Sequence, residues 1–262
     1  MKPIVIKTGS NVLTTESGRL DLNNVRYLTD QIAAVLKRGV PVIWVSSGAI
    51  TCGSQRLGLK PESTEEKQAA AAVGQIVLMS EYSRFMEPKG IHIAQILVTR
   101  DGLQDPRRAE YTQNTMRTLL TQAVLPVVNE NDTIAVEEIC FGDNDELSAM
   151  VAILMQASKL ILLTNQEGLF NSDPDENPNA ILIQEVDKVT RDIETFVSQT
   201  FSKHGRGGMS SKIQAARAAT EAGIEVYVAH GRERDVILKI LDGARLGTHF
   251  KAQRIDASAR AH

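Results

Sequence analysis

Two lysines in glycine-containing turns are the side chains of this sequence best suited to chemistry on an anion. Lys7 ends an apolar segment and is followed by Thr8-Gly9-Ser10-Asn11, whereas Lys212 follows Gly207-Gly208-Met209-Ser210-Ser211. Small residues leave backbone N–H groups open to an anion, and a lysine adds a positive charge beside them. Both turns are candidate phosphate or carboxylate sites, although a solvated lysine before a tight turn explains the first one equally well.

Three further polar clusters are candidates for binding a ligand. They are Ser46-Ser47-Gly48, Asn129-Glu130-Asn131-Asp132 and Gly142-Asp143-Asn144-Asp145. Capping of a helix is the simpler explanation for the first cluster. The second could bind an amine, a metal or a hydroxyl group, because a turn needs only one or two such residues. The third holds more polar side chains than the cap of a helix requires.

Short apolar segments precede most of these clusters and predict the strands of a sheet. The segments are Pro3–Lys7, Val40–Val45, Ile91–Val98, Val124–Val128, Leu160–Leu163 and Ile224–Val228. They are rich in Ile, Val and Leu without polar alternation, as expected for strands that are covered on both faces. Ligands bind beyond the carboxyl ends of strands in such sheets, so the residues just after each segment are the ones to examine for function.

Amphipathic segments between these strands predict helices. The helices are expected over Leu22–Arg38, Thr64–Met86, Asp145–Gln156, Ser211–Ala222 and Glu233–Leu241. Glycines 39, 223 and 243 mark the ends of three of them. The alternation of strands and helices predicts an α/β fold with a mainly parallel sheet and helices on both faces. No linker rich in Pro, Gly or Ser divides the chain.

Three segments depart from this alternation. Thr133–Phe141 alternates apolar and polar residues and predicts a strand pair beside the main sheet. Asn171–Asn179 contains Pro174 and Pro178 and is expected to be an exposed loop. Residues 254–262 are expected to be a frayed or non-native tail.

Composition excludes several classes of protein. The 262 residues carry 29 Lys and Arg against 32 Asp and Glu, and the net charge of −3 argues against general nucleic-acid binding. Cys52 and Cys140 are too few for a disulfide framework or a cysteine-rich zinc site and fit a reducing cytoplasm. No apolar run approaches the roughly 20 residues that span a bilayer, so we expect no membrane association.

Several common catalytic and binding motifs are absent. The sequence has no Walker A loop, no dinucleotide-binding glycine pattern and no protein-kinase signature. The histidines show no metal-ligand spacing, so we expect no metal ion held by a dedicated set of side chains. Trp44 lies in a predicted core strand, which favours packing over stacking on a ligand.

In their order along the chain, the strand-end motifs resemble those of the amino acid kinase family. The matching segments are VIKTGSNVL, VSSGAI, KQAAAAVGQ, VNEND, FGDNDELSA, LLTNQEGLF and GGMSSK. The resemblance extends from about Val5 to Gln253, essentially the whole chain. VNEND, GDND and KQAAAAVGQ point to the branch of the family that phosphorylates glutamate.

The resemblance implies a three-layer αβα sandwich that transfers a phosphoryl group from ATP, with Mg²⁺, to the γ-carboxylate of L-glutamate. Lys7 and Lys212 would converge on the phosphoryl group, and Asp145 would hold both lysines by charge pairing. Catalysis would come from alignment and positive charge, because an anion must attack a polyanion.

Binding residues are implied by the same resemblance. Ser47, Asp132 and Asn144 match the glutamate-binding positions, and Asn129 and Asp143 are neighbours expected to help. The nucleotide-binding positions are Lys7, Thr164, Asn165, Arg206, Gly207, Gly208, Met209, Ser210, Ser211 and Lys212. Residues 1–253 would form one kinase domain, with glutamate on the half up to about residue 170 and ATP on the half from about 171 to 253.

Two positions depart from the pattern of many relatives, which have Asp where this chain has Asn165 and Thr where it has Arg206. The first difference removes a charge near the nucleotide and the second adds one, so we expect an effect on nucleotide affinity and not on the reaction. Many bacterial members also carry a C-terminal PUA domain, and we expect this chain to be the short form without it.

Two other functions stay open at this point. One is a sister kinase acting on N-acetylglutamate, aspartate, carbamate or a nucleoside monophosphate, against which the VNEND and GDND motifs argue. The other is an amino-acid-binding sensor without activity, against which the intact Lys7, Asp145 and Lys212 argue. The resemblance also implies feedback inhibition by proline and a homo-oligomer, for which the apolar stretch Ala69–Met79 is a candidate interface beside its use in core packing.

Overall fold

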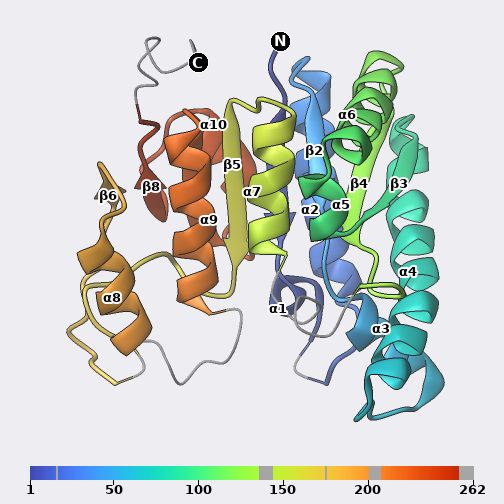
Figure 1. Cartoon of the computed structure of the whole chain (residues 1–262), viewed down its shortest axis with the longest axis horizontal. Helices are drawn as coiled ribbons and strands as arrows, with labels where there is room; N and C mark the ends of the chain where they lie inside the picture. The colour runs from blue at the N-terminus through green and yellow to red at the C-terminus, as the bar shows by residue number, and fades with distance from the viewer. Residues whose placement is uncertain (16, 136–143, 175, 201–207, 254–262) are drawn as a thin grey trace.

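A computed structural model describes residues 1–15, 17–135, 144–174, 176–200 and 208–253, and it shows one central sheet between helices (Figure 1). From one edge to the other, the strands are β3 (Ile93–Val98), β4 (Leu125–Glu130), β2 (Val42–Val45), β1 (Ile4–Thr8), β5 (Lys159–Thr164), β7 (Glu225–His230), β8 (Thr248–Phe250) and β6 (Glu185–Val186). The first six run parallel, β8 runs antiparallel to β7, and β6 runs parallel to β8. The mainly parallel sheet is therefore confirmed.

Helices cover both faces of the sheet. One face packs against α5 (Arg100–Gln104), α6 (Pro106–Thr121), α7 (Asp145–Leu154), α8 (Arg191–Thr200) and α9 (Met209–Glu221). The other face packs against α1 (Ser10–Leu13), α2 (Leu22–Lys37), α3 (Ala49–Leu57), α4 (Thr64–Met86) and α10 (Val236–Leu241). Alternate residues of β1 show this division, because Val5 lies in the first apolar core and Ile6 in the second. This arrangement confirms the three-layer αβα sandwich.

The predicted strands are confirmed within two residues at each end and the predicted helices within three. The sequence pattern did not predict β6 and β8, which have only 2 and 3 residues. It also missed α6, in which only Ala109 and Met116 are buried, so that an apolar stripe is almost absent. The start of α6 did carry a signal, because Asp105 caps the helix and Pro106 is its first residue.

Two of the three irregular segments are partly described. The predicted strand pair over 133–141 lies outside the described residues from 136 on, and Thr133 and Ile134 form a turn. The segment Asn171–Asn179 has no helix or strand where it is described, but Asp173 is only 3% exposed, so the prediction of an exposed loop is wrong for that residue. The predicted tail, 254–262, also lies outside the described residues.

Two glycines let α3 and α4 touch backbone to backbone. A Cβ atom on Gly53 would lie 1.7 Å from the carbonyl oxygen of Ala70, and one on Gly74 would lie 1.8 Å from that of Ala49. Any larger residue would therefore separate the two helices. Gly74 belongs to the KQAAAAVGQ segment, so this crossing is the physical reason for part of that motif. The crossing fixes the start of α3, which directly follows the turn at Ser46, Ser47 and Gly48.

Trp44 and Tyr82 anchor the ends of the two central strands. The indole Nε1 of Trp44 donates a hydrogen bond to Thr8 Oγ1 at 3.0 Å, and its ring lies 4.2 Å from the ring of Tyr82, centroid to centroid. The Tyr82 hydroxyl in turn lies 2.7 Å from Ser46 Oγ. Trp44 is fully buried, which confirms packing rather than stacking on a ligand. Among the residues described, no helix is both long and apolar enough to cross a membrane.

Candidate active site

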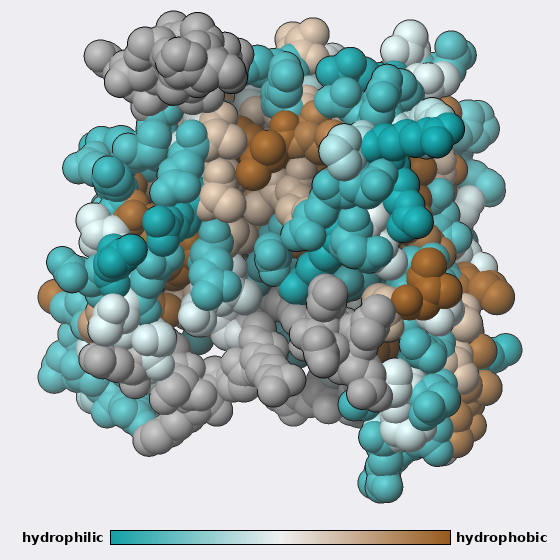
Figure 2. All heavy atoms as spheres, viewed as in Figure 1, coloured by the Kyte–Doolittle hydropathy of each residue, from teal (hydrophilic) through white to brown (hydrophobic). Residues whose placement is uncertain are grey.

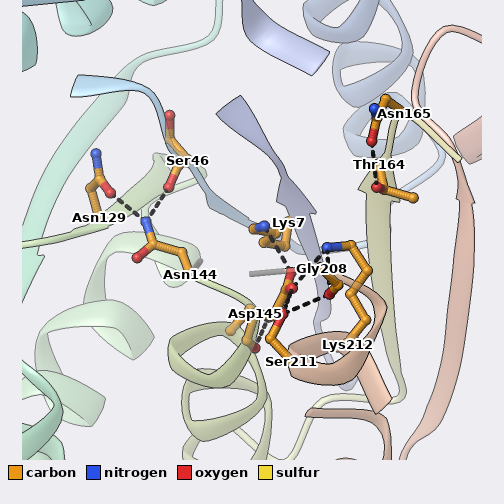
Figure 3. A network of polar contacts seen from close by, with 11 residues as sticks. Lys7, Ser46, Asn129, Asn144, Asp145, Thr164, Asn165, Gly208, Ser211 and Lys212 are labelled. Carbon is orange, nitrogen blue, oxygen red and sulfur yellow. Dashed lines mark hydrogen bonds and ion pairs between the residues drawn. The ribbon is translucent and has the colours of Figure 1, made fainter. Parts of the chain in front are cut away.

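Lys7, Asp145 and Lys212 meet at the carboxyl edge of the sheet, although they come from β1, α7 and α9 (Figure 3). Lys7 Nζ lies 2.7 Å from Asp145 Oδ1, and Lys212 Nζ lies 3.0 Å from Asp145 Oδ2. Ser211 Oγ donates a hydrogen bond to the same Oδ2 at 2.8 Å. The side chains of Lys7 and Asp145 are fully buried and that of Lys212 is 5% exposed. One carboxylate thus holds two buried ammonium groups.

The electrostatics of this cluster favour an anionic ligand. Burial opposes ionisation of Asp145, but the charges of Lys7 and Lys212 outweigh it and lower the pKa of the carboxyl group. With Asp145 ionised, the three side chains carry one net positive charge. The N-terminal N–H groups of α9 add to it, because Gly208 at the N-cap offers no side-chain hydrogen bond to them. A negatively charged ligand would balance the net positive charge of the cluster and accept hydrogen bonds from these N–H groups.

A second cluster of amides and hydroxyls lies over β2 and β4. Asn144 Nδ2 donates to the Ser46 carbonyl oxygen at 2.7 Å and to Asn129 Oδ1 at 2.6 Å. Ser47 Oγ and Asn129 Nδ2 are buried, and neither atom has a hydrogen-bond partner within the described part of the chain. Buried polar atoms without partners are costly, so these two atoms mark the positions where a polar ligand would bind.

Asp132 lies in the turn after β4, and it is half-buried. Burial raises the pKa of its carboxyl group to about 6. An ammonium group bound beside Asp132 would favour the ionised form and lower that pKa. The side chain is therefore suited to an amine, in agreement with the role that the family resemblance implies.

The nucleotide-binding positions fall into two groups. Thr164 ends β5 and its Oγ1 donates to Asn165 Oδ1 at 3.3 Å; Figure 3 shows this pair apart from the lysine cluster. Gly208, Ser210 and Ser211 lie at the start of α9, whereas Met209 is 2% exposed and packs in the core. The Met209 side chain is thus part of the core and does not line the surface at this position. Asp143, Arg206 and Gly207 lie outside the described residues.

Two charged residues beside the site were not predicted from the sequence to belong to it. Glu130, which ends β4, is 2% exposed, and Arg100, which begins α5, has a side chain 14% exposed. Arg100 follows the predicted strand Ile91–Val98, so inspection of the end of that strand would have found it. Glu130 lay inside a polar cluster, but nothing in the sequence marks it as more deeply buried than Asp132.

Comparison with known proteins supports the family that the strand-end motifs resemble. The model of the amino acid kinase family matches residues 2–230. The chain is 44% identical to the glutamate 5-kinase of Syntrophus aciditrophicus over 264 aligned residues, covering 100% of this chain and 68% of that protein. It is 46% identical to the glutamate 5-kinase of Clostridium acetobutylicum over 249 residues, covering 94% of this chain and 93% of that protein.

Solved structures of the same fold have distant sequences. Isopentenyl phosphate kinase of T. acidophilum superposes with a TM-score of 0.69 at 17% identity, covering 95% of this chain and 100% of that one. Carbamate kinase of Giardia lamblia bound to AMP-PNP superposes with a TM-score of 0.67 at 19% identity, covering 96% and 99%. The fold and the closer sequence relatives agree, so the chain belongs to the amino acid kinase family and, within it, to the glutamate 5-kinases.

Proposed function

We propose that the protein transfers the γ-phosphoryl group of ATP to the γ-carboxylate of L-glutamate. The product is L-glutamyl 5-phosphate, and the reaction is the first step of proline biosynthesis from glutamate. The observation that carries this proposal is the buried Lys7–Asp145–Lys212 cluster beside the unpartnered polar atoms of Ser47 and Asn129, in a chain of this family. In this proposal, the lysine cluster would bind the phosphoryl group and the unpartnered polar atoms would bind the amino acid.

The reaction needs no general base. A glutamate side chain has a pKa near 4.3, so the nucleophile is already ionised at pH 7. The barrier instead arises because one anion must approach another, and positioned positive charge lowers it. Lys7 and Lys212 supply that charge in this proposal, and Asp145 keeps both ammonium groups aimed at the transferred phosphoryl group.

The phosphoryl donor in this proposal is ATP with its Mg²⁺. When bound, the ion would neutralise charge on the β- and γ-phosphates. Oxygen atoms are the ligands that Mg²⁺ prefers, so the phosphates of the nucleotide would help to hold it. Thr164 and Asn165, at the end of the first half of the domain, and the start of α9, in the half after about residue 170, would hold the nucleotide. The cytoplasm is the proposed compartment, since ATP is the donor and Cys52 is a free thiol.

A panel of acceptors tests the proposed reaction. ADP release, measured by a coupled assay with ATP and Mg²⁺, is expected to be fastest with L-glutamate. The panel also contains N-acetylglutamate, aspartate, carbamate and a nucleoside monophosphate, and a reaction without acceptor gives the background. Turnover with another acceptor and none with glutamate would identify a sister kinase. No turnover with any acceptor, together with measurable glutamate binding, would favour the sensor.

We also propose that proline competes with glutamate. The two molecules share an α-carboxylate and a neighbouring amine, so both fit the polar atoms around Ser47, Asn129 and Asp132. Titrations of glutamate at several proline concentrations are expected to show a rising apparent KM at constant kcat. A KM that does not change with proline would refute the competition.

A homo-oligomer is the third part of the proposal. Strand β3 lies at an edge of the sheet, and Leu97 on it is 38% exposed, whereas Ile76 on the adjacent helix α4 is 71% exposed. Figure 2 shows apolar residues along the side of the molecule where Figure 1 places α4 and β3. Exposed apolar groups beside an open sheet edge favour pairing with another chain. Light scattering is expected to give at least a dimer, and a monomer mass at assay concentration would contradict it.

A further inference from the structure

Arg100 connects the two segments that carry the amino-acid site. It begins α5, shortly after β3, and β3 pairs with β4 so that Val98 lies opposite Glu130. Its guanidinium Nη1 donates a hydrogen bond to Glu146 Oε2 on α7 at 2.8 Å, and its Nε lies 3.9 Å from Glu130 Oε1. A single side chain thus lies between carboxylates from two other elements.

The position of these two carboxylates relates them to the site. Glu130 directly follows Asn129, and Glu146 directly follows Asp145. The end of β4 and the start of α7 are therefore linked twice, once by the hydrogen bond from Asn144 Nδ2 to Asn129 Oδ1 and once through Arg100. Two links between the same segments restrict both the separation and the relative rotation of strand end and helix start.

Stability alone does not account for this arrangement. Glu130 is 2% exposed, and its Oε1 and the Nε of Arg100 lack hydrogen-bond partners among the residues that the structure describes. Buried charges in such a setting are often no more stabilising than apolar side chains of similar volume. The ion pairs of Arg100 thus stabilise the fold weakly, yet its two partners directly follow Asn129 and Asp145. We therefore explain these ion pairs by the geometry that they impose on the site.

The charges around Glu130 fit this role. Burial raises the pKa of its carboxyl group to about 7. Arg100 opposes this shift, whereas Asp101 on the same helix, Asp132 after β4 and Glu146 on α7 reinforce it. Among these four charged groups around Glu130, Arg100 is therefore the positive one. Because Glu130 can take up a proton, removal of Arg100 need not leave a buried charge and the fold is expected to survive it.

We propose that Arg100 is a positioning residue of this site, which holds the start of α7 against the end of β4 through Glu146 and Glu130. The inference rests on the proposed function, because the groups that it aligns are Asn129 and Asn144, which bind glutamate in that proposal. Arg100 acts through these residues, and the proposal does not require it to touch the substrate.

Kinetics of an Arg100→Gln variant test the role in the reaction. We expect kcat/KM for glutamate to fall about tenfold to a hundredfold, as for other displacements of groups that align reactants, with the KM for ATP unchanged. Arg100→Lys is expected to recover only part of the loss, because one ammonium group cannot bridge two carboxylates as a guanidinium does. Arg108→Gln is the matched control, since Arg108 pairs with Asp101 at 3.8 Å on the surface, with side chains 69% and 66% exposed. The activity of Arg108→Gln is expected to equal that of the wild type.

Amide hydrogen exchange tests the same role without any assay of activity. Exchange in residues 145–150 is expected to be faster in Arg100→Gln than in the wild type or Arg108→Gln. Two results would overturn the positioning role. One is an unchanged rate of exchange in residues 145–150 of Arg100→Gln, and the other is an equal loss in kcat/KM for glutamate and for ATP. A wild-type chain that does not phosphorylate glutamate would count against the proposed function, and the exchange result would then decide the role of Arg100 alone.

Discussion

Lys212→Ala is expected to lower kcat for glutamate phosphorylation by about a hundredfold or more, because it removes a charge already in place for the transition state. The ammonium group of Lys212 is held 3.0 Å from Asp145 Oδ2 in a side chain that is 5% exposed. It therefore needs no reorganisation when negative charge develops on the transferred phosphoryl group. Because Lys7 stays paired with Asp145 at 2.7 Å, the variant keeps a compensated carboxylate and is expected to fold. Steady-state ADP release at saturating glutamate and ATP gives kcat, and circular dichroism confirms the fold.

Two further variants separate charge from packing. Ser211→Ala removes the other hydrogen bond to Asp145 Oδ2 but leaves both lysines, so a loss far smaller than that of Lys212→Ala is expected. Lys212→Arg keeps the charge but spreads it over a planar group, and an intermediate rate is expected. Equal losses in Lys212→Ala and Ser211→Ala would show that the local structure matters and the charge does not. An unchanged kcat in Lys212→Ala would refute the proposed mechanism.

The positions of the site-forming strands could be predicted from the sequence because their signal is local. Continuous apolar segments such as Val124–Val128 indicate strands covered on both faces, and ligand-binding residues follow such strands. This rule marked the clusters that contain Lys7, Ser47 and Asn129 as candidates, and the family resemblance singled out Ser47 among them. The structure places Lys7 and Asn129 at the carboxyl ends of β1 and β4, and Ser47 just after β2. The roles of these residues stay predictions until variants are measured.

Other parts of the site depend on packing that no local pattern records. The 3.9 Å approach of Arg100 to Glu130 requires β3 and β4 to be neighbours, although helices α5 and α6 separate these strands in the sequence. The pKa of Glu130 follows from its burial, and the sequence does not distinguish it from the more exposed Asp132. Helix α6 escaped detection for the opposite reason, since its surface is largely solvent-exposed and its apolar spacing is weak.

Asp145→Asn is expected to have the largest effect on stability, because it leaves two ammonium groups buried without their carboxylate. Removal of one partner from a buried ion pair typically costs about 3–5 kcal/mol. Urea unfolding at pH 7 measures this loss. The matched control is Asp242→Asn, since Asp242 pairs with Arg38 at 2.6 Å but the two side chains are 59% and 45% exposed. Such surface pairs contribute about 0–1 kcal/mol, so the control is expected to unfold close to the wild type.

The pH dependence of the stability, and the effect of ATP on it, test the electrostatic reason for the loss in Asp145→Asn. The lysines lower the pKa of Asp145 below its ordinary value of 3.8, so the folded state binds fewer protons than the unfolded state between the two pKa values. Stability from this cluster is thus complete above about pH 4, and the wild type should lose it as the pH falls towards the lowered pKa. The difference in the free energy of unfolding between the wild type and Asp145→Asn is expected to become smaller as the pH falls over that range. ATP should stabilise the variant more than the wild type, because its phosphates supply the negative charge that the variant lacks. A variant as stable as the wild type at pH 7, with an equal response to ATP, would show that Asp145 does not balance the two lysines.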